Sequence, residues 1–293
     1  MEKRTYFKTE KISETVTRIT GIARELMYLV VGTEKAALID TGVGIGDLKD
    51  CVENLTDKPV IVLLTHGHTD HALGASEFQE VYMGLADLNV YKEHSQMSFR
   101  KEILKLSMGD QIEMINDEDF VLPKSIDFKP LNTGDVFHLG GITLEIYECK
   151  GHTQGSVVIL LKEERTLILG DACNPNTVLF LEGSSPVEAY KGELEQLNKS
   201  IKDCYDKVYI SHDSGDSSKE LIHTVIAVCE DIMEGESDDI PINFLGYDTY
   251  YAKDVTPLGE RADGRVGNIM YDKNRVFVSK KLSYYQKYQS EVT

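Results

Sequence analysis

Four side chains of metal-binding type stand close together in the first quarter of the chain: His66, His68, Asp70 and His71. They follow the apolar run Val60 to Leu64, which predicts a strand buried on both faces. Side chains two residues apart in an extended segment point the same way, so His66 and His68 can converge on one ion. Imidazole and carboxylate groups are ligands that zinc accepts. A polar turn with incidental histidines is disfavoured, because three of the chain's eight histidines fall within this short stretch.

Three later segments repeat this layout, in which an apolar strand ends and a metal-binding type of side chain follows. They are Thr143 to Cys149 with His152, Thr166 to Leu169 with Asp171, and Val208 to Ile210 with His212. Open α/β sheets place their sites beyond the carboxyl ends of strands, so these loops can meet at one edge. Asp70 and His71 lie where the chain turns toward a helix and can face a second ion. Together the candidate ligands suit two metal ions.

Other patterns indicate the elements that must position these side chains. Further strand-like runs cover Val16 to Ile19, Met27 to Val31, Ala36 to Ile39 and Val157 to Leu161. Two helices are expected to begin with capping boxes, at Ser185-Pro-Val-Glu188 and at Ser217-x-x-Glu220. Strands and helices that alternate after an initial run of strands predict an α/β protein with a helix-covered sheet core.

Two regions are less regular. In residues 91 to 130, Phe99 to Leu106 is typical of a helix and Asp117 to Asp119 of a solvated loop. Core packing is favoured over a roof above a pocket for Met97, Phe99, Met108 and Met114. After residue 235 the chain is expected to mix loop with strand, including Gly246 to Tyr251 and Arg275 to Val278. Tyrosines of an edge strand are favoured over a pocket lining there. We expect His94 and His223 at the surface and Cys173 as a packed thiol.

Composition limits the classes of function. The formal net charge of −18 repels phosphate backbones, so we expect a small-molecule substrate and no nucleic-acid partner. The five cysteines are scattered and form no CxxC pair, which suits a reducing compartment. No apolar run approaches the roughly 20 residues of a membrane helix, and no secretory signal is recognisable. The expectation is a cytoplasmic protein without membrane contact; the oligomeric state is not readable.

The order of these motifs resembles that of the metallo-β-lactamase superfamily. The residues that carry the resemblance are Ile39-Asp40-Thr-Gly42, His66-x-His68-x-Asp70-His71, Gly151-His152-Thr-x-Gly155-Ser156, Gly170-Asp171 and His212. The match spans roughly residues 16 to 230. It implies an αββα sandwich, two mixed sheets flanked by helices, with metals at one edge between the sheets. We divide the chain into a catalytic domain, residues 1–235, and a C-terminal extension, residues 236–293, packed on the same domain.

The resemblance also assigns roles. His66, His68 and His152 resemble the ligands of a first metal, and Asp70, His71 and His212 those of a second, with Asp171 bridging. Asp40 resembles an aspartate that orients the metal-binding loop. The implied enzyme is a metallo-hydrolase holding two divalent ions, with Zn²⁺ expected and Fe or Mn accepted by the same ligands. A hydroxide that bridges both ions would cleave an ester-like bond, such as a thioester or lactone. Asp70 would also handle a proton for the leaving group.

Other branches of the superfamily remain as alternatives. Persulfide dioxygenases share the motif but use one iron, here held by His66, His152 and Asp171. A phosphodiesterase or nuclease is the second alternative, and the strong negative charge counts against it. The full ligand set is that of thioester hydrolases resembling glyoxalase II and of lactonases. The helical substrate-binding region of glyoxalase II is not recognisable after residue 235.

Overall fold

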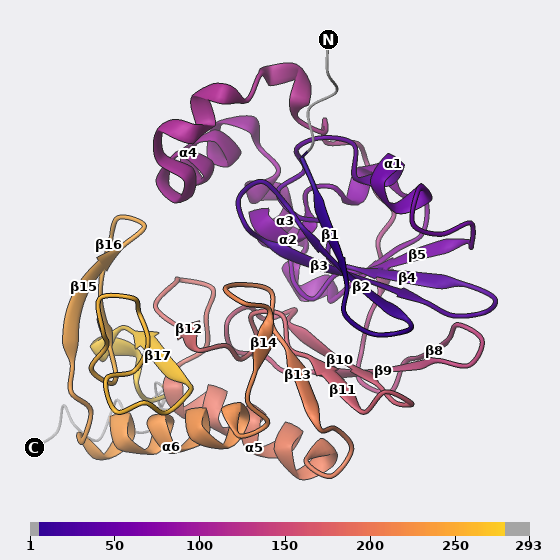
Figure 1. Cartoon of the computed structure of the whole chain (residues 1–293). Coiled ribbons are helices and arrows are strands. Elements are labelled where there is room, and N and C mark those ends of the chain that lie inside the picture. Colours follow the sequence, from indigo (N-terminus) through magenta and orange to yellow (C-terminus); the bar gives the residue numbers. More distant parts are fainter. Residues whose placement is uncertain (1–5, 279–293) are drawn as a thin grey trace, which may run out of the picture.

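The computed structural model describes residues 6–278 and stacks its elements in four layers. Figure 1 shows two β-sheets facing each other, with helices on the outer side of each. The αββα arrangement predicted from the sequence is thereby confirmed. Within residues 6–278, none of the helices has the length and apolar character that a bilayer span requires.

The first sheet has seven strands in sequential order. They are β1 (Lys8–Lys11), β2 (Val16–Thr20), β3 (Leu26–Val31), β4 (Ala36–Ile39), β5 (Val60–Leu63), β6 (Val81–Met83) and β7 (Lys129–Pro130). Strands β1 to β4 pair antiparallel, and β4 to β7 pair parallel, so the sheet is mixed. The predicted strands of this half are confirmed to within one residue.

The second sheet has six strands in the order β14-β13-β11-β10-β9-β8. Their bounds are β8 (Val136–His138), β9 (Thr143–Glu148), β10 (Val157–Leu161), β11 (Thr166–Ile168), β13 (Lys207–Tyr209) and β14 (Asp216–Ser217). Only the β11–β13 pair among them is parallel. Every residue of β10 is buried, because the sheet is covered on both faces.

Apolar clusters fill each interface between layers. The cluster between the two sheets includes Tyr28, Ile39 and Ile159. On the outer face of the first sheet, Leu48 and Val52 of α1 pack into a second cluster. The second sheet is covered by α5 and α6. The helix bounds are α1 (Leu48–Glu53), α2 (Thr69–Ala72), α3 (Leu88–His94), α4 (Met97–Met108), α5 (Val187–Ile201) and α6 (Leu221–Glu234).

Both predicted capping boxes are wrong, because neither helix has a side-chain hydrogen bond at its N-cap. Helix α5 begins at Val187, and the hydroxyl of Ser185 accepts a hydrogen bond from Gln154 Nε2 at 3.2 Å. The carboxylate of Glu188 accepts instead from the Val278 backbone N–H at 2.8 Å. Helix α6 begins at Leu221, and Ser217 pairs as a residue of strand β14.

The helical segment between β6 and β7 is fixed to the loop that follows β4 by a buried arginine. Arg100 of α4 is 1% exposed and donates hydrogen bonds to the carbonyls of Val43, Gly44 and Val121. Met97 and Met108 pack in the core of this segment as expected, whereas Met114 is exposed. The stretch predicted as a solvated loop is exposed but forms a 3₁₀ turn. The 3₁₀ helices are η1 (Ala75–Glu77), η2 (Leu85–Asp87), η3 (Gly109–Met114), η4 (Asp117–Asp119) and η5 (Lys273–Arg275).

A third, smaller sheet joins the end of the chain to the middle. Its order is β12-β17-β16-β15, with β12 (Asn176–Val178), β15 (Ile240–Phe244), β16 (Tyr247–Tyr251) and β17 (Asn268–Tyr271). Strand β12 pairs parallel with β17, so residues on both sides of position 235 share one sheet. The strand predicted over Gly246 to Tyr251 is present. Arg275 to Val278 forms no strand: Arg275 ends the 3₁₀ helix η5, and a bend follows it. The division at residue 235 stays a prediction, and residues 279–293 lie outside the described part.

Candidate metal centre

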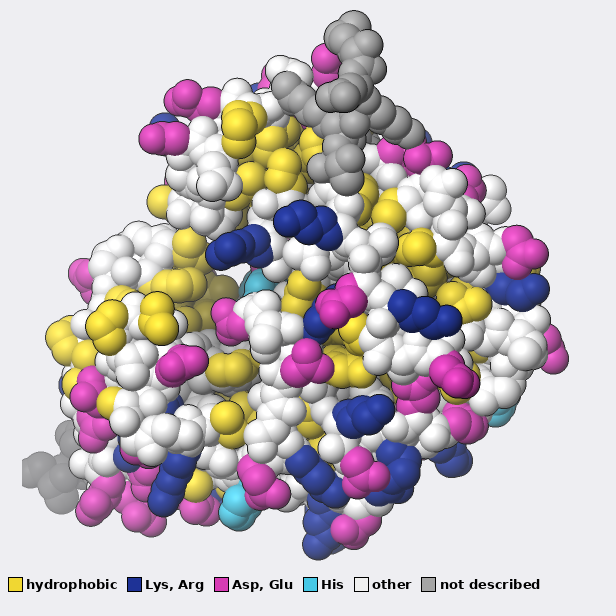
Figure 2. All heavy atoms as spheres, in the orientation of Figure 1, with side chains coloured by type: hydrophobic (Ala, Val, Ile, Leu, Met, Phe, Trp, Pro, Cys, Tyr) yellow, Lys and Arg dark blue, Asp and Glu magenta, His cyan; other side chains and the backbone are white. Residues whose placement is uncertain are grey.

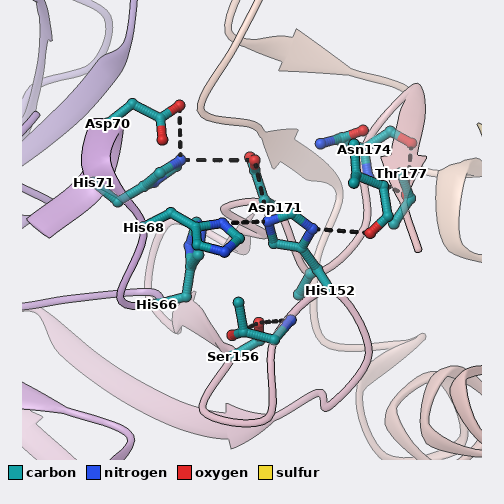
Figure 3. Close-up of polar contacts among 12 residues, drawn as sticks. His66, His68, Asp70, His71, His152, Ser156, Asp171, Asn174 and Thr177 are labelled. Carbon is teal, nitrogen blue, oxygen red and sulfur yellow. Dashed lines mark hydrogen bonds and ion pairs between the residues drawn. The ribbon is translucent and has the colours of Figure 1, made fainter. Parts of the chain in front are cut away.

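The loops that follow β5, β9, β11 and β13 meet at one site. Figure 3 shows the labelled side chains of the first three loops pointing toward one another. The four loops bring together all seven ligands predicted from the sequence. Potential ligand atoms lie within 4.8 Å of one another in three groups: His66, His68 and His152; His66, His71 and Asp171; and Asp70, His71 and His212. The structure therefore places the two predicted triads side by side. They meet at His66 of the first triad and His71 of the second, with Asp171 beside both.

Hydrogen bonds direct the lone pairs of three histidines inward. His152 Nδ1 donates to the Val178 carbonyl at 2.9 Å, which leaves the Nε2 lone pair free. The Thr65 hydroxyl donates to Asp40 Oδ2 at 2.8 Å, so it accepts from His66 Nδ1 at 3.1 Å. His71 Nδ1 donates to the same Asp40 oxygen at 2.8 Å. In each ring the nitrogen that remains for a metal is Nε2.

In the first triad these lone pairs face one another across short distances. His68 Nδ1 lies 3.1 Å from His66 Nε2 and 2.9 Å from His152 Nε2. Because His66 and His152 have their protons on the outward nitrogens, the inward nitrogens concentrate negative potential at one point. A cation between the three rings would be favourable, and this donor set suits a borderline metal such as zinc.

Asp171 lies between the two triads. Its Oδ2 is 3.8 Å from His152 Nε2, 3.7 Å from His71 Nε2 and 3.1 Å from His212 Nε2. Gly170 before it has a φ of +55°, and a Cβ there would lie 2.7 Å from Thr65 Oγ1. Only glycine adopts this backbone conformation easily and allows the two loops to approach so closely.

The charges of the two triads differ. Burial and the neighbouring histidines hold the pKa of His66 and of His68 well below the ordinary value, so both rings are neutral and able to bind a metal. Burial alone would lower the pKa of His71, but the carboxylates of Asp70 and Asp171 raise it well above the ordinary value. Against the same burial penalty, Asp171 raises the pKa of His212 to about 9. A cation bound there would replace protons.

Two buried polar atoms in this cluster have no hydrogen-bond partner among the described residues: His71 Nε2 and Asp171 Oδ1. Buried polar groups normally have hydrogen-bond partners, and a site for a bound ion is one reason for an exception. Both atoms belong to the group in which the two triads meet. The orphaned atoms, the inward lone pairs and the donor chemistry all fit bound metal ions.

Asp40 supports the metal-binding loop, as the resemblance implies. It accepts hydrogen bonds from the Thr65 N–H at 2.7 Å, the Thr65 hydroxyl and His71 Nδ1. Its backbone has a φ of +62°, a conformation that is uncommon outside glycine and is tolerated by aspartate. The surrounding contacts hold this strain at a position that orients two ligand-bearing segments.

Sequence reasoning missed a second buried carboxylate, Asp87, which is 0% exposed. Its Oδ2 accepts from the Gly67 N–H at 2.9 Å and from the Thr153 hydroxyl at 2.6 Å, and its Oδ1 accepts from the Gly155 N–H at 2.7 Å. It therefore ties the loop of His66 and His68 to the loop of His152. Asp87 precedes helix α3 and belongs to no ligand motif, so a single sequence carries no signal for it.

The prediction that His94 lies on the surface is wrong. Its ring is partly buried, stacks on His68 with centroids 4.8 Å apart, and tilts against Phe99 at 4.3 Å. His94 Nδ1 accepts from the Thr69 N–H at 3.1 Å. The charged neighbours along the chain concealed this, because α3 turns only its C-terminal residue toward the site. His223 is exposed and Cys173 is fully buried, as predicted.

The fold and this site define the class of protein. The family model of the metallo-beta-lactamase superfamily matches residues 23–212, and the chain belongs to this superfamily. It is an enzyme, a metal-binding hydrolase of that superfamily.

Three relatives illustrate the likeness. The chain is 24% identical over 202 residues to acyl-coenzyme A thioesterase MBLAC2 of Homo sapiens, covering 59% of this chain and 67% of the relative. It is 27% identical over 188 residues to hydroxyacylglutathione hydrolase GloC of Haemophilus influenzae, covering 63% and 80%. A solved metallo-beta-lactamase from Pontibacter korlensis superposes with a TM-score of 0.54 at 20% identity, over 75% of this chain and 97% of that one. This last likeness shows the fold alone.

Proposed function

We propose that the protein is a dinuclear metal-dependent thioesterase that acts on a small-molecule acyl thioester. The observation that carries the proposal is the meeting of two ligand triads around His66, His71 and Asp171. His66, His68 and His152 would hold a first ion, and Asp70, His71 and His212 a second, with Asp171 between them. Zn²⁺ is the expected ion.

Bound divalent ions would supply Lewis acidity, which activates water and polarises the scissile carbonyl. The chain's own residues prepare the site for this chemistry. Asp40 and the Val178 carbonyl fix the tautomers of His71 and His152, so the inward nitrogens need no reorganisation. Asp70 has a half-open position beside His71 and His212, where its carboxylate can pass a proton to a leaving group.

The choice of thioesters over other esters is supported by relatives rather than by the metal site. Three groups of relatives are named for the hydrolysis of thioesters: an acyl-coenzyme A thioesterase, a hydroxyacylglutathione hydrolase and atrochrysone carboxyl ACP thioesterases. The metal ligands alone would equally serve a lactone. The expected substrate is therefore an acyl group joined to a thiol, with the thiol carrier left open.

The test combines elemental analysis with a hydrolysis screen. Protein purified without added metal is expected to hold about two equivalents of zinc or manganese and to cleave thioesters faster than lactones or phosphodiesters. His152→Ala should lose metal and turnover, whereas His223→Ala, an exposed histidine outside the site, should keep both. Turnover that survives complete removal of metal would overturn the proposal. One equivalent of iron, with oxygen consumption on a persulfide and no hydrolysis, would replace it by the dioxygenase alternative.

A further inference from the structure

The C-terminal sheet has two faces with different neighbours. Ile269 and Tyr271 of β17 pack into the core formed by α5 and α6. Met270 between them belongs to a separate cluster, because side chains alternate across a strand. We call this second cluster the apolar wall; it consists of Val178, Phe180, Leu181, Ile240, Ile242, Phe244, Tyr251, Val255 and Met270. Helix α6 packs against β17 from the other side.

The apolar wall begins at the metal centre. Val178 contributes its side chain to the wall, while its carbonyl accepts the hydrogen bond from His152 at 2.9 Å. Two residues further on, the ring of Phe180 lies 6.2 Å from that of Phe244 and 5.5 Å from that of Tyr247, measured between centroids. Apolar side chains therefore extend from β12, whose Val178 carbonyl holds a ligand histidine, to the aromatic rings of the β15–β16 hairpin.

Part of this surface is open to solvent. Tyr247 is 54% exposed, and Phe244 is partly exposed. Figure 2 shows a hollow between α4 and the β15–β16 hairpin, with hydrophobic side chains gathered around it and a histidine visible at its side. Aromatic area left in water beside a reactive site favours an apolar ligand, because covering it removes apolar surface from water.

We propose that the apolar wall binds the acyl group of the substrate, and that the substrate class is thioesters with acyl chains of several carbons or with an aromatic acyl group. This inference rests on the proposed function. The thiol carriers of the relatives are polar molecules, and coenzyme A bears phosphates, which require cationic or hydrogen-bonding partners. The side chains that form the wall are themselves hydrophobic and offer no cation to a phosphate. The acyl group, which extends from the scissile carbonyl, is therefore the part that fits it.

The test compares hydrolysis of decanoyl-CoA and acetyl-CoA by the zinc-supplemented full chain and its variants. Tyr247→Ala and Phe244→Ala are expected to lower the ratio of kcat/KM for decanoyl-CoA over acetyl-CoA by about ten-fold, the order of a half-buried ring's contribution. Tyr247→Phe retains the ring and should retain most of the ratio. Val136→Ala serves as the control, because Val136 is a 46% exposed apolar residue on β8 of the second sheet, outside the wall.

A second measurement separates this inference from the proposed function. Binding of decanoate, the product, is followed by calorimetry in the same variants, and it is expected to weaken about ten-fold in Tyr247→Ala. If both thioesters are cleaved and the kcat/KM ratio is unchanged in both alanine variants, the proposal that the wall binds the acyl group is overturned. The proposed thioesterase activity is then upheld. If no thioester is cleaved, the thioesterase fails; weakened decanoate binding in Tyr247→Ala would then uphold the wall, and equal binding would overturn it.

Discussion

The metal-binding loops and the apolar wall lie side by side but are held in different ways. His66 and His71 are 0% exposed, and the loops that carry the ligands are tied by the carboxylates of Asp40 and Asp87. The wall is held by apolar packing, and Tyr247 next to it is half exposed. Hydrogen bonds fix one geometry, whereas apolar contact is non-directional. The first region suits a fixed reaction, and the second suits acyl groups of differing shape.

The largest effect is expected from the residue where the two triads meet. Asp171→Ala removes the carboxylate that contacts His152, His71 and His212. Turnover should fall by more than about 10³-fold, and bound metal should drop below two equivalents, because Lewis acidity and ligand charge are both lost. Elemental analysis and kinetics measure the two effects. Full activity in this variant would contradict the dinuclear assignment.

The same contrast explains what the sequence could predict. Four of the ligands stand in one short stretch after a buried strand: His66, His68, Asp70 and His71. Such spacing can be recognised in a single sequence. The central strands β3, β4, β5 and β10 can be predicted for a similar reason, because their apolar runs are continuous, whereas the edge strands β1 and β14 are polar and were not predicted. Asp87 and the apolar wall are not, because their contacts span large separations: Asp87 bonds to Gly155, and Phe180 meets Tyr247. A capping pattern such as Ser217-x-x-Glu220 misleads because strand pairing outweighs local preference.

A buried carboxyl without a full set of hydrogen-bond partners, beside the loop that follows β4, should give the folded chain a pH-dependent stability. Glu25 is 2% exposed, its Oε1 accepts from the Val43 N–H at 3.2 Å, and its Oε2 has no partner. Burial raises its pKa from 4.5 to about 7, so the folded chain holds this proton more tightly than the unfolded chain. The stabilising contribution is complete below pH 4.5 and is lost as the pH rises to about 7, which amounts to about 3 kcal/mol.

The comparison is between metal-free wild type and Glu25→Gln, which stays neutral at every pH. Their difference in free energy of unfolding is expected to change by about 3 kcal/mol in favour of the variant between pH 4.5 and pH 7. Urea unfolding at several pH values measures it. A constant difference across this range would show that Glu25 titrates alike in the folded and unfolded chains, so that burial does not raise its pKa.

A smaller effect is expected from the carboxylate that joins two ligand loops. Asp87→Asn places an amide NH₂ either against the Gly155 N–H or against the Gly67 N–H and the Thr153 hydroxyl. One donor then faces another, and the loops shift apart. Metal affinity should fall about 10- to 100-fold, the usual range for a group that orients metal ligands. Asp206→Asn, which alters an exposed ion pair with Arg165, is the control. Equal affinity in both variants would mean that the loops hold their positions without Asp87.

The smallest effect is expected at the end of α3, where one residue makes both a hydrogen bond and an apolar ring contact. His94 combines a directional contact, the acceptor for the Thr69 N–H, with a non-directional one, the stack on His68. His94→Phe keeps the stack and loses the hydrogen bond, which should lower turnover about five-fold, the order of one lost hydrogen bond. His94→Ala loses both contacts and should lower turnover further, with metal content unchanged because His94 is not among the clustered ligands.

His223→Phe on the exposed face of α6 controls for the substitution itself. If the phenylalanine and alanine variants are equally impaired, the hydrogen bond alone positions His68; if neither is impaired, the loop is already fixed by Asp40 and Asp87.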